Sequence, residues 1–406
     1  MIIPHLLRFI FITPSLILLS CSATIEKLPD LKSNFAVGRT KIDILSQRDS
    51  IFQKGEKRKF FVEIYYPAKI QKNPANYSSV FRPKEEEGLE LFLDRIQTKF
   101  PKSNFRSLST HTYIDAPNLN LGKFPIILFE PGRDYSSGMY LNIYENLVSS
   151  GFIVIAIDHS YDSAVSVLNS GEIFTIPEEI QDSYKHAEEI NDFSELSERV
   201  SQLDKTRLDD VREVLNLIPL WNKTNTILRN TLDETSIGIL GHSYGGKISL
   251  ILNGNEPKIK CAVSLDSLIK NFGNADILSE EAQKAFYQTK PFLILLSRDT
   301  FHRDYLGIDP KENNEAFLNA LTEEPDIHQH IRFMRDTKHL SYMDTGYLIP
   351  WFRKNRVFGE IDPLEFYSKL NQTLNLFFTI HLKKNPNSQL DFNKLIDNDP
   401  FEQIDN

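Results

Sequence analysis

Ser243 stands in a pattern that could make its hydroxyl a nucleophile. The sequence Gly-His-Ser-Tyr-Gly at 241–245 follows an apolar run at 237–240 and precedes a segment of helical character. A serine between a buried strand and a helix, with a glycine two residues to either side, projects from a sharp turn at the carboxyl edge of a sheet. The pattern therefore predicts a nucleophile. The alternative is a Gly-rich turn whose serine only caps the helix.

A serine hydroxyl needs a base beside it to react at neutral pH, and histidine suits this task because its ordinary pKa lies near neutrality. His339 has the expected position for the base, in the loop after an apolar run at 331–334. The other histidines of this region precede that run or lead into it: His302, His328 and His330. His339 is therefore the predicted base.

The histidine in turn needs an acid to orient it, and two aspartates follow strand-like runs beyond the serine. Asp266 comes directly after the run 259–265, and Asp299 comes after the run 292–296. Many hydrolases carry the acid after the second strand beyond the nucleophile, which favours Asp299. Either aspartate could instead cap a following helix. The residues alone leave both candidates open.

An oxyanion hole requires two backbone N–H groups directed at the developing negative charge. Tyr244, the residue after the nucleophile, is expected to supply the first. The second is expected from the loop Phe-Glu-Pro-Gly-Arg-Asp at 129–134, where Gly132 permits a close approach of the backbone. Arg133 is the predicted donor in this loop, so the predicted oxyanion hole consists of Tyr244 and Arg133.

The elements that would position these residues follow a βα rhythm. Short apolar runs, typical of buried strands, alternate with helical segments from residue 124 onward. The expected strands are 60–66, 124–129, 152–157, 237–240, 259–265, 292–296 and 331–334, and the expected helices include 86–100, 141–149, 177–219 and 364–382. Such alternation requires a mostly parallel central sheet with helices on both faces. The predicted fold class is α/β, of the α/β-hydrolase type.

Composition narrows the class of function. The chain of 406 residues is 41% hydrophobic and 25% charged, which is usual for a globular protein with a large core. The net charge of −9 argues against a nucleic-acid partner, because nothing in the sequence offers a basic face for phosphates. No cysteine and histidine cluster shows metal-ligand spacing, and the pair His328 and His330 is more typical of a solvated strand face. We therefore expect no metal and no cofactor.

The N-terminus has the character of an export signal. Residues 1–20 contain an apolar stretch that is too short to span a membrane as a helix. It ends in Leu-Leu-Ser-Cys at 18–21, which resembles the lipobox of bacterial lipoproteins, so we expect cleavage before Cys21 and lipidation of this cysteine. The alternative is ordinary secretion with cleavage near Ala23. Cys261 lies in an apolar run and is expected to be a small buried hydrophobe.

These features divide the chain into four parts. They are a lipoprotein signal peptide at 1–20, a polar spacer at 21–36, an α/β-hydrolase domain at 37–383 and a polar C-terminal tail at 384–406. Acyl chains on Cys21 would anchor the protein to a membrane. The expected localisation is that of an exported bacterial lipoprotein on the periplasmic or cell-surface side.

Several of these segments together resemble the platelet-activating-factor acetylhydrolases of the plasma, lipoprotein-associated phospholipase type. The likeness extends from about Val37 to Lys383 and is carried by the segments 37–40, 64–67, 124–129, 150–159, 207–218 and 241–246. In that family the acid follows the strand immediately after the nucleophile helix. The resemblance therefore implies Asp266 rather than Asp299, with His339 as the base, and it places a usual family histidine at His159.

The resemblance also implies an activity: calcium-independent hydrolysis of short or oxidised sn-2 acyl esters of phospholipids, with Ser243 as the nucleophile. This chain departs from the family in the oxyanion loop, where Glu130 replaces a serine and Arg133 replaces a more apolar residue. Arg133 could attract an acidic or phosphate head group. The alternatives are a general carboxylesterase or polyester hydrolase of the same fold, and a surface lipoprotein that keeps the fold for binding without catalysis.

Overall fold

The computed structural model describes residues 28–31, 33, 36–81, 84, 86–87, 90, 102–178, 180, 194–267, 281, 285, 290–297, 329–349, 358–398 and 400–402. The expected signal peptide, Cys21, Asp299, His302 and His328 lie outside these residues, as does most of the helix expected at 86–100. No described helix is long and apolar enough to cross a membrane.

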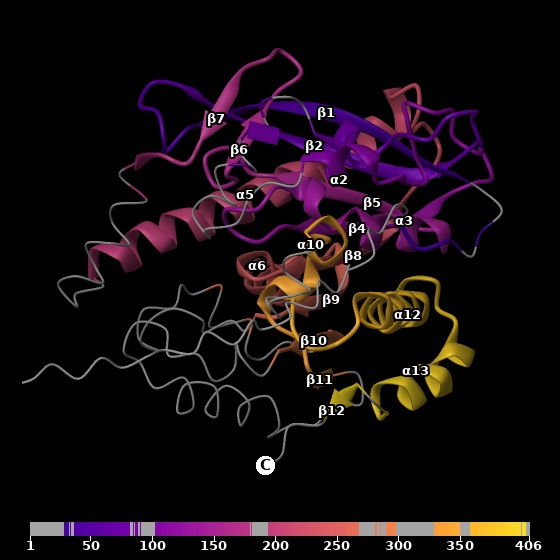
Figure 1. Ribbon diagram of the computed structural model, residues 1–406. Helices are drawn as coiled ribbons and strands as arrows, with labels where there is room; N and C mark the ends of the chain where they lie inside the picture. Colours follow the sequence, from indigo (N-terminus) through magenta and orange to yellow (C-terminus); the bar gives the residue numbers. More distant parts are fainter. Residues whose placement is uncertain are drawn as a thin grey trace, which may run out of the picture.

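The described part of the chain contains a 10-stranded sheet and a two-stranded hairpin (Figure 1). The strands of the sheet are β1 (Ala36–Asp49), β2 (Lys57–Ala68), β3 (Thr112–Ile114), β4 (Phe124–Glu130), β5 (Ile153–Asp158), β8 (Leu232–His242), β9 (Ile259–Leu265), β10 (Phe292–Leu296), β11 (Gln329–Met334) and β12 (Phe401–Glu402). The hairpin consists of β6 (Val165–Val167) and β7 (Ile173–Thr175). The helices are α2 (Lys102–Ser107), α3 (Leu141–Ser149), α5 (Ser194–Thr224), α6 (Tyr244–Asn255), α10 (Thr345–Leu348), α12 (Pro363–Leu382) and α13 (Gln389–Ile396), with the 3-10 turns η1 (Tyr77–Val80), η2 (Ser137–Tyr140), η5 (His339–Tyr342) and η6 (Pro386–Ser388).

The sheet is mostly parallel, as the sequence predicts. Its order is β12-β11-β10-β9-β8-β4-β5-β2-β1-β3. The strands from β11 to β5 run parallel, whereas β2 is antiparallel to both of its neighbours and β12 is antiparallel to β11. The carboxyl ends of β4, β8, β9 and β11 therefore meet at one edge of the sheet, where open α/β sheets bind their ligands.

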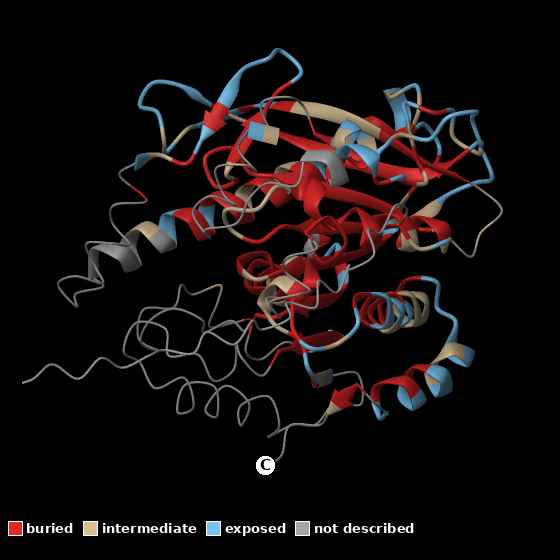
Figure 2. Ribbon diagram, in the orientation of Figure 1, coloured by how far each residue is buried: buried red, intermediate tan, exposed pale blue. Residues whose placement is uncertain are grey.

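Helices cover both faces of the sheet (Figure 1), with α3 and α12 against one face and α5 and α6 against the other. Alternate side chains of a strand point to opposite faces. In β4, Ile127 and Phe129 join the core beneath α3 and α12, while Ile126 and Leu128 join the core beneath α5 and α6. Figure 2 shows these central strands as buried. The predicted α/β fold with helices on both faces is confirmed.

The domain includes an N-terminal strand that the sequence analysis did not predict. β1 pairs with β2 along most of its length, although its charged residues obscure the strand pattern. One of these residues, Arg39, is buried because it forms an ion pair with Glu63 of β2. Leu28, inside the expected spacer, is also buried, and its N–H donates to the carbonyl of Ser109. Part of the segment 21–36 therefore belongs to the folded domain.

The segment 384–406, expected as a polar tail, also contributes to the domain. Phe392, Leu395 and Ile396 of α13 lie in the same core as α12, and β12 adds a strand beside β11. These three apolar residues have the spacing of one helical face. The polar residues between them conceal that face in the overall composition. The domain therefore extends to at least residue 402 rather than ending at 383.

Candidate active site

Ser243 forms the sharp turn between β8 and α6. Its backbone has φ 54° and ψ −126°, a conformation that residues with a side chain rarely adopt. Glycines permit the turn, because a side chain at Gly241 would collide with the carbonyl of Gly245, and a side chain at Gly245 would collide with the carbonyl of Glu130. The turn leaves Ser243 half-buried at the carboxyl end of β8.

His339 and Asp266 form a hydrogen-bonded chain with Ser243. His339 Nε2 lies 2.9 Å from Ser243 Oγ, and His339 Nδ1 lies 2.7 Å from Asp266 Oδ2. Asp266 directly follows β9 and is fully buried, whereas His339 begins η5 after β11 and is partly exposed. The structure thus brings together the three residues that the resemblance implied, from the ends of three strands.

The neighbouring strand holds Asp266 in position. Ser297, directly after β10, donates its N–H to Asp266 Oδ1 at 2.6 Å and its hydroxyl to Asp266 Oδ2 at 3.1 Å. Asp266 itself has a positive φ of 56°. Both carboxylate oxygens are therefore engaged, and Oδ2 is also directed at the imidazole of His339. The sequence analysis gave Ser297 no role, and its position after a strand was the only signal.

The loop after β4 lies against the turn at Ser243. A Cβ at Gly132 would come 3.2 Å from Ser243 Cβ, and the carbonyls of Glu130 and Pro131 lie so close to Gly245 that only glycine fits there. Tyr244 begins α6, so its N–H lies at the positive end of a helix. The predicted oxyanion loop and the first turn of α6 therefore meet beside Ser243.

Arg133, the second predicted oxyanion donor, lies in this loop with its side chain beside a carboxylate. Arg133 Nε is 3.6 Å from Asp162 Oδ1, and the guanidinium is largely buried. The N–H of the next residue, Asp134, donates to the carbonyl of Asp162 at 3.0 Å. Asp162 therefore anchors both the side chain and the backbone of this stretch, and it offsets the charge that Arg133 would present to an anionic head group.

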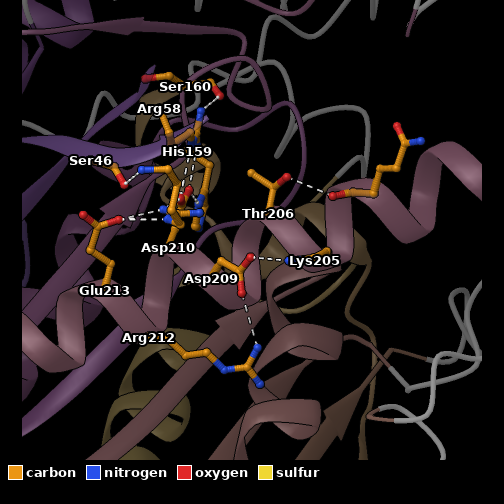
Figure 3. Close-up of polar contacts among 12 residues, drawn as sticks. Ser46, Arg58, His159, Ser160, Lys205, Thr206, Asp209, Asp210, Arg212 and Glu213 are labelled. Carbon is orange, nitrogen blue, oxygen red and sulfur yellow. Dashed lines mark hydrogen bonds and ion pairs between the residues drawn. The ribbon is translucent and has the colours of Figure 1, made fainter. Parts of the chain in front are cut away.

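A buried cluster of charged side chains supports the loop after β4. Figure 3 shows His159 and Arg58 converging on Asp210 of α5. His159 Nδ1 lies 2.8 Å from Asp210 Oδ2, and His159 Nε2 lies 2.9 Å from Glu130 Oε2. Burial alone would lower the pKa of His159, but Glu130 and Asp210 outweigh it and raise that pKa. Because a carboxylate oxygen faces each ring nitrogen, both nitrogens donate, and the ring links Glu130, next to the loop, to α5.

Arg207 connects the same cluster to the loop backbone. Its Nη1 donates to the carbonyl of Pro131 at 2.6 Å, and its Nε donates to Asp162 at 2.5 Å. The most buried members of the cluster are three basic and three acidic side chains: Arg58, Arg207, His159, Glu130, Asp162 and Asp210. Two less buried arginines, Arg48 and Arg133, add to it beside Asp210 and Asp162. Glu130, unusual for the family resemblance, is thus part of a buried network of paired charges.

Asp344 is a further buried carboxyl at this edge of the sheet. Asp344 Oδ2 accepts hydrogen bonds from the Tyr77 hydroxyl at 2.6 Å and from the Asn142 N–H at 3.2 Å. Burial raises the pKa of Asp344 to about 7. Its contacts join η1 and the start of α3 to the segment that follows His339. The sequence analysis gave Asp344 no role.

Two aromatic residues without a role in the sequence analysis also lie at the site. Tyr140 Oη is 2.9 Å from His242 Nδ1, and both side chains are fully buried. The position of His242 directly before Ser243 was the only signal for this contact.

Within the described ranges, no group of three or more His, Cys, Asp or Glu side chains is arranged to hold a metal ion.

Comparisons with known proteins converge on one group. The sequence model of the family described as platelet-activating factor acetylhydrolase, isoform II, matches residues 20–394. Similar curated proteins are platelet-activating factor acetylhydrolases from Cavia porcellus, 25% identical over 242 residues, and from Canis lupus familiaris, 26% identical over 244 residues. Each alignment covers 56% of this chain and 54% of the relative, so the chain spans about half the length of these relatives.

A solved structure supports the fold. The ferulic acid esterase from Streptomyces cinnamoneus superposes with a TM-score of 0.63 at 18% identity, over 90% of this chain and 96% of that chain. At this level of identity the likeness concerns the α/β-hydrolase fold alone. The family match covers far more than half of the sequence. The chain therefore belongs to the family of platelet-activating factor acetylhydrolase, isoform II.

Proposed function

We propose that the protein is a serine ester hydrolase with Ser243 as its nucleophile. One observation carries the proposal: Ser243 Oγ, His339 and Asp266 are linked by contacts of 2.9 and 2.7 Å. These contacts lie at a strained turn between a strand and a helix, which is where this class of nucleophile occurs. Family membership supports an ester as the substrate.

In the proposed acylation, Ser243 Oγ attacks the ester carbonyl carbon while His339 Nε2 takes the hydroxyl proton. The carbonyl electron pair moves to oxygen, and the N–H groups of Tyr244 and Arg133 stabilise that oxyanion. When the intermediate collapses, the ester C–O bond breaks and His339 returns the proton to the departing alcohol. Asp266 accepts from Nδ1–H throughout and keeps Nε2 directed at Ser243.

Deacylation repeats these steps with water. His339 removes a proton from water as its oxygen attacks the acyl carbonyl, and the oxyanion forms at the same N–H groups. Collapse releases the carboxylic acid, and Ser243 recovers its proton from His339. No step of this mechanism uses a calcium ion, so the proposed activity includes calcium independence, which hydrolysis in excess chelator would test.

The proposed substrates are short or oxidised sn-2 acyl esters of phospholipids, on the strength of family membership. A general carboxylesterase or polyester hydrolase of the same fold is the second candidate, because Asp162 offsets the charge of Arg133 and the described loop shows no unopposed cation for a phosphate. Competition between a short-chain phospholipid and an aryl ester separates them. Strong inhibition of aryl-ester turnover by the phospholipid favours the first candidate.

Ser243→Ala is expected to lower the turnover of short-chain p-nitrophenyl esters by about five orders of magnitude, because no other group replaces the nucleophile. The matched control is Ser236→Ala, seven residues earlier in β8, which should retain full turnover. A fluorophosphonate should label the parent protein and the Ser236 variant but not the Ser243 variant. Unchanged hydrolysis by Ser243→Ala would refute the proposed nucleophile, and an unlabelled, inactive parent protein would favour a binding lipoprotein.

The proposal extends to the location of the enzyme. The lipobox-like sequence at 18–21 supports export and lipidation of Cys21. A lipid at this position would hold the domain at a membrane, the surface that contains phospholipid esters. The proposed enzyme is therefore an exported lipoprotein whose substrate is available in, or leaves from, a lipid layer.

A further inference from the structure

Hydrogen bonds connect the loop of the proposed oxyanion donor to the loop of the proposed base. The Gly132 N–H lies 3.2 Å from Tyr140 Oη, which lies 2.9 Å from His242 Nδ1. At the other side of the ring, His242 Nε2 lies 3.1 Å from the carbonyl oxygen of His339. Two side chains thus join the backbone of Gly132 to the backbone of His339.

These hydrogen bonds form a path from the Gly132 N–H through Tyr140 and His242 to the His339 carbonyl. The chemistry of the atoms fixes the position of each proton along this path. The His339 carbonyl can only accept, so His242 Nε2 carries a hydrogen. Burial, together with the neighbouring His339, lowers the pKa of His242 well below its ordinary value, so the ring is neutral and Nδ1 accepts. Tyr140 therefore donates to Nδ1, and its oxygen accepts from the Gly132 N–H. Burial raises the pKa of Tyr140, which keeps the phenol protonated.

Packing holds the His242 ring in this orientation. The ring stacks against those of Tyr135 and Tyr342, at centroid distances of 5.9 and 5.8 Å and interplanar angles of 20° and 28°. The side chains of Tyr140 and His242 are 0% exposed. Water therefore cannot readily replace either partner, and a broken contact would leave buried polar atoms unsatisfied.

We infer that Tyr140 and His242 are positioning residues for the ester hydrolysis proposed above, and that they hold the oxyanion loop in register with the base. The inference rests on that proposed function. It assigns the two residues an effect on the transition state through Gly132 and His339, without contact to the substrate.

The path fixes the backbone next to both the proposed oxyanion donor, Arg133, and the proposed base, His339. Gly132 is the most adaptable residue of its loop because it lacks a Cβ. The bond from its N–H fixes one of the two peptide planes that flank Gly132, and the other plane carries the Arg133 N–H. The bond to the His339 carbonyl fixes the backbone from which the imidazole extends. Small displacements at such positions reduce rates because the reacting atoms lose alignment.

Tyr140→Phe removes only the hydroxyl and is the first test. We expect kcat for a p-nitrophenyl ester to fall about tenfold, as for the loss of one buried hydrogen bond, with KM within about twofold of the parent value. The inhibition constant of a trifluoromethyl ketone, which forms an oxyanion on Ser243, should rise by the same factor as kcat/KM falls. A residue that only stabilises the fold would leave both quantities unchanged in the folded enzyme.

Tyr144→Phe is the matched control. Tyr144 is equally buried, and its hydroxyl donates to the Ser137 carbonyl at 2.7 Å rather than to the path. Both variants lose one buried hydroxyl contact, so both should lose similar stability in urea. Only the Tyr140 variant should lose kcat and affinity for the ketone.

His242→Gln provides a second variant that does not depend on the folding of the first. Its amide can still donate to the His339 carbonyl but lies too far from Tyr140 to replace Nδ1. It should lower kcat by about the same factor as Tyr140→Phe, and the double variant should be no slower than the worse single one, because both break the same path. Fully additive losses would overturn the inference.

The outcomes also separate this inference from the proposed function. If the parent enzyme has no hydrolysis that depends on Ser243, both fail. If the parent is active and Tyr140→Phe matches Tyr144→Phe in kcat and in ketone affinity, the positioning role is wrong while the serine hydrolase remains. A change confined to KM would equally exclude the role.

Discussion

The orientation of the Asp266 side chain is fixed by its hydrogen-bond partners. It accepts from Ser297 through both oxygens and from His339 through Oδ2. Asp266→Asn would keep the size of the side chain but allow an amide group to face Nδ1, which favours the wrong imidazole tautomer. We expect kcat for aryl esters to fall by about four orders of magnitude. Steady-state kinetics at saturating ester would measure this loss.

The companion variant is Asp299→Asn, which tests the acid favoured by strand position alone. It should retain kcat within about twofold, because Asp266 already occupies the partner position of His339. Loss of activity in Asp299→Asn with normal activity in Asp266→Asn would reverse the assignment of the acid.

At the same scale, sequence patterns were informative where the chain itself positions the residue. The glycines around Ser243 predict a tight turn, and His339 follows a strand in the expected place. The choice between Asp266 and Asp299 could not be made from spacing, because both follow strands that end at the same edge. The contact between Tyr140 and His242 could not be predicted either. It joins residues 102 positions apart, so it depends on how the chain packs in three dimensions.

Among the elements, Asp344 connects η1, α3 and the segment after η5. Burial raises its pKa from 3.8 to about 7, so between these values the folded protein holds a proton that the unfolded chain has released. Stability therefore falls as pH rises from about 4 to about 7. Asp344→Asn should remove this fall, which is on the order of 4 kcal/mol for a shift of this size. Urea unfolding at pH 4 and pH 8 would measure it.

The check on this prediction is the difference in unfolding free energy between the parent and Asp344→Asn, which should change between pH 4 and pH 8. Parallel pH curves for the parent and the Asp344 variant would show that this carboxyl does not titrate as described.

Elements were predictable where one physical signal dominated. The buried parallel strands β9 and β10 and the helix α3 have the expected bounds, because continuous apolar runs and a clear amphipathic period mark them. β1 was missed because its sequence contains charged residues, which are not typical of a buried strand. In the fold, contacts across the strand pair neutralise some of these charges, as in the ion pair of Arg39 with Glu63. α13 was missed because three apolar side chains in a polar segment give a weak signal.

At the scale of the whole molecule, the proposed lipid anchor makes a prediction about location. Cys21→Ala should abolish incorporation of labelled palmitate and move the protein from the membrane fraction to the soluble fraction, because acyl chains supply the membrane affinity. The control is Cys261→Ala, since Cys261 is buried in the core and cannot be acylated in the folded domain. Labelling of the Cys21 variant at wild-type level would exclude this anchor.

β12 gives the chain end a protective role. It pairs with β11 through Phe333 and Met334, so the outer backbone edge of β11 is covered at that point. A protein shortened at Lys383 would lose α13 and β12 together and would present an open strand edge next to an uncovered apolar surface. Open edges of this kind template sheet-to-sheet association between copies. The residues of α13 and β12 thereby protect the domain against aggregation.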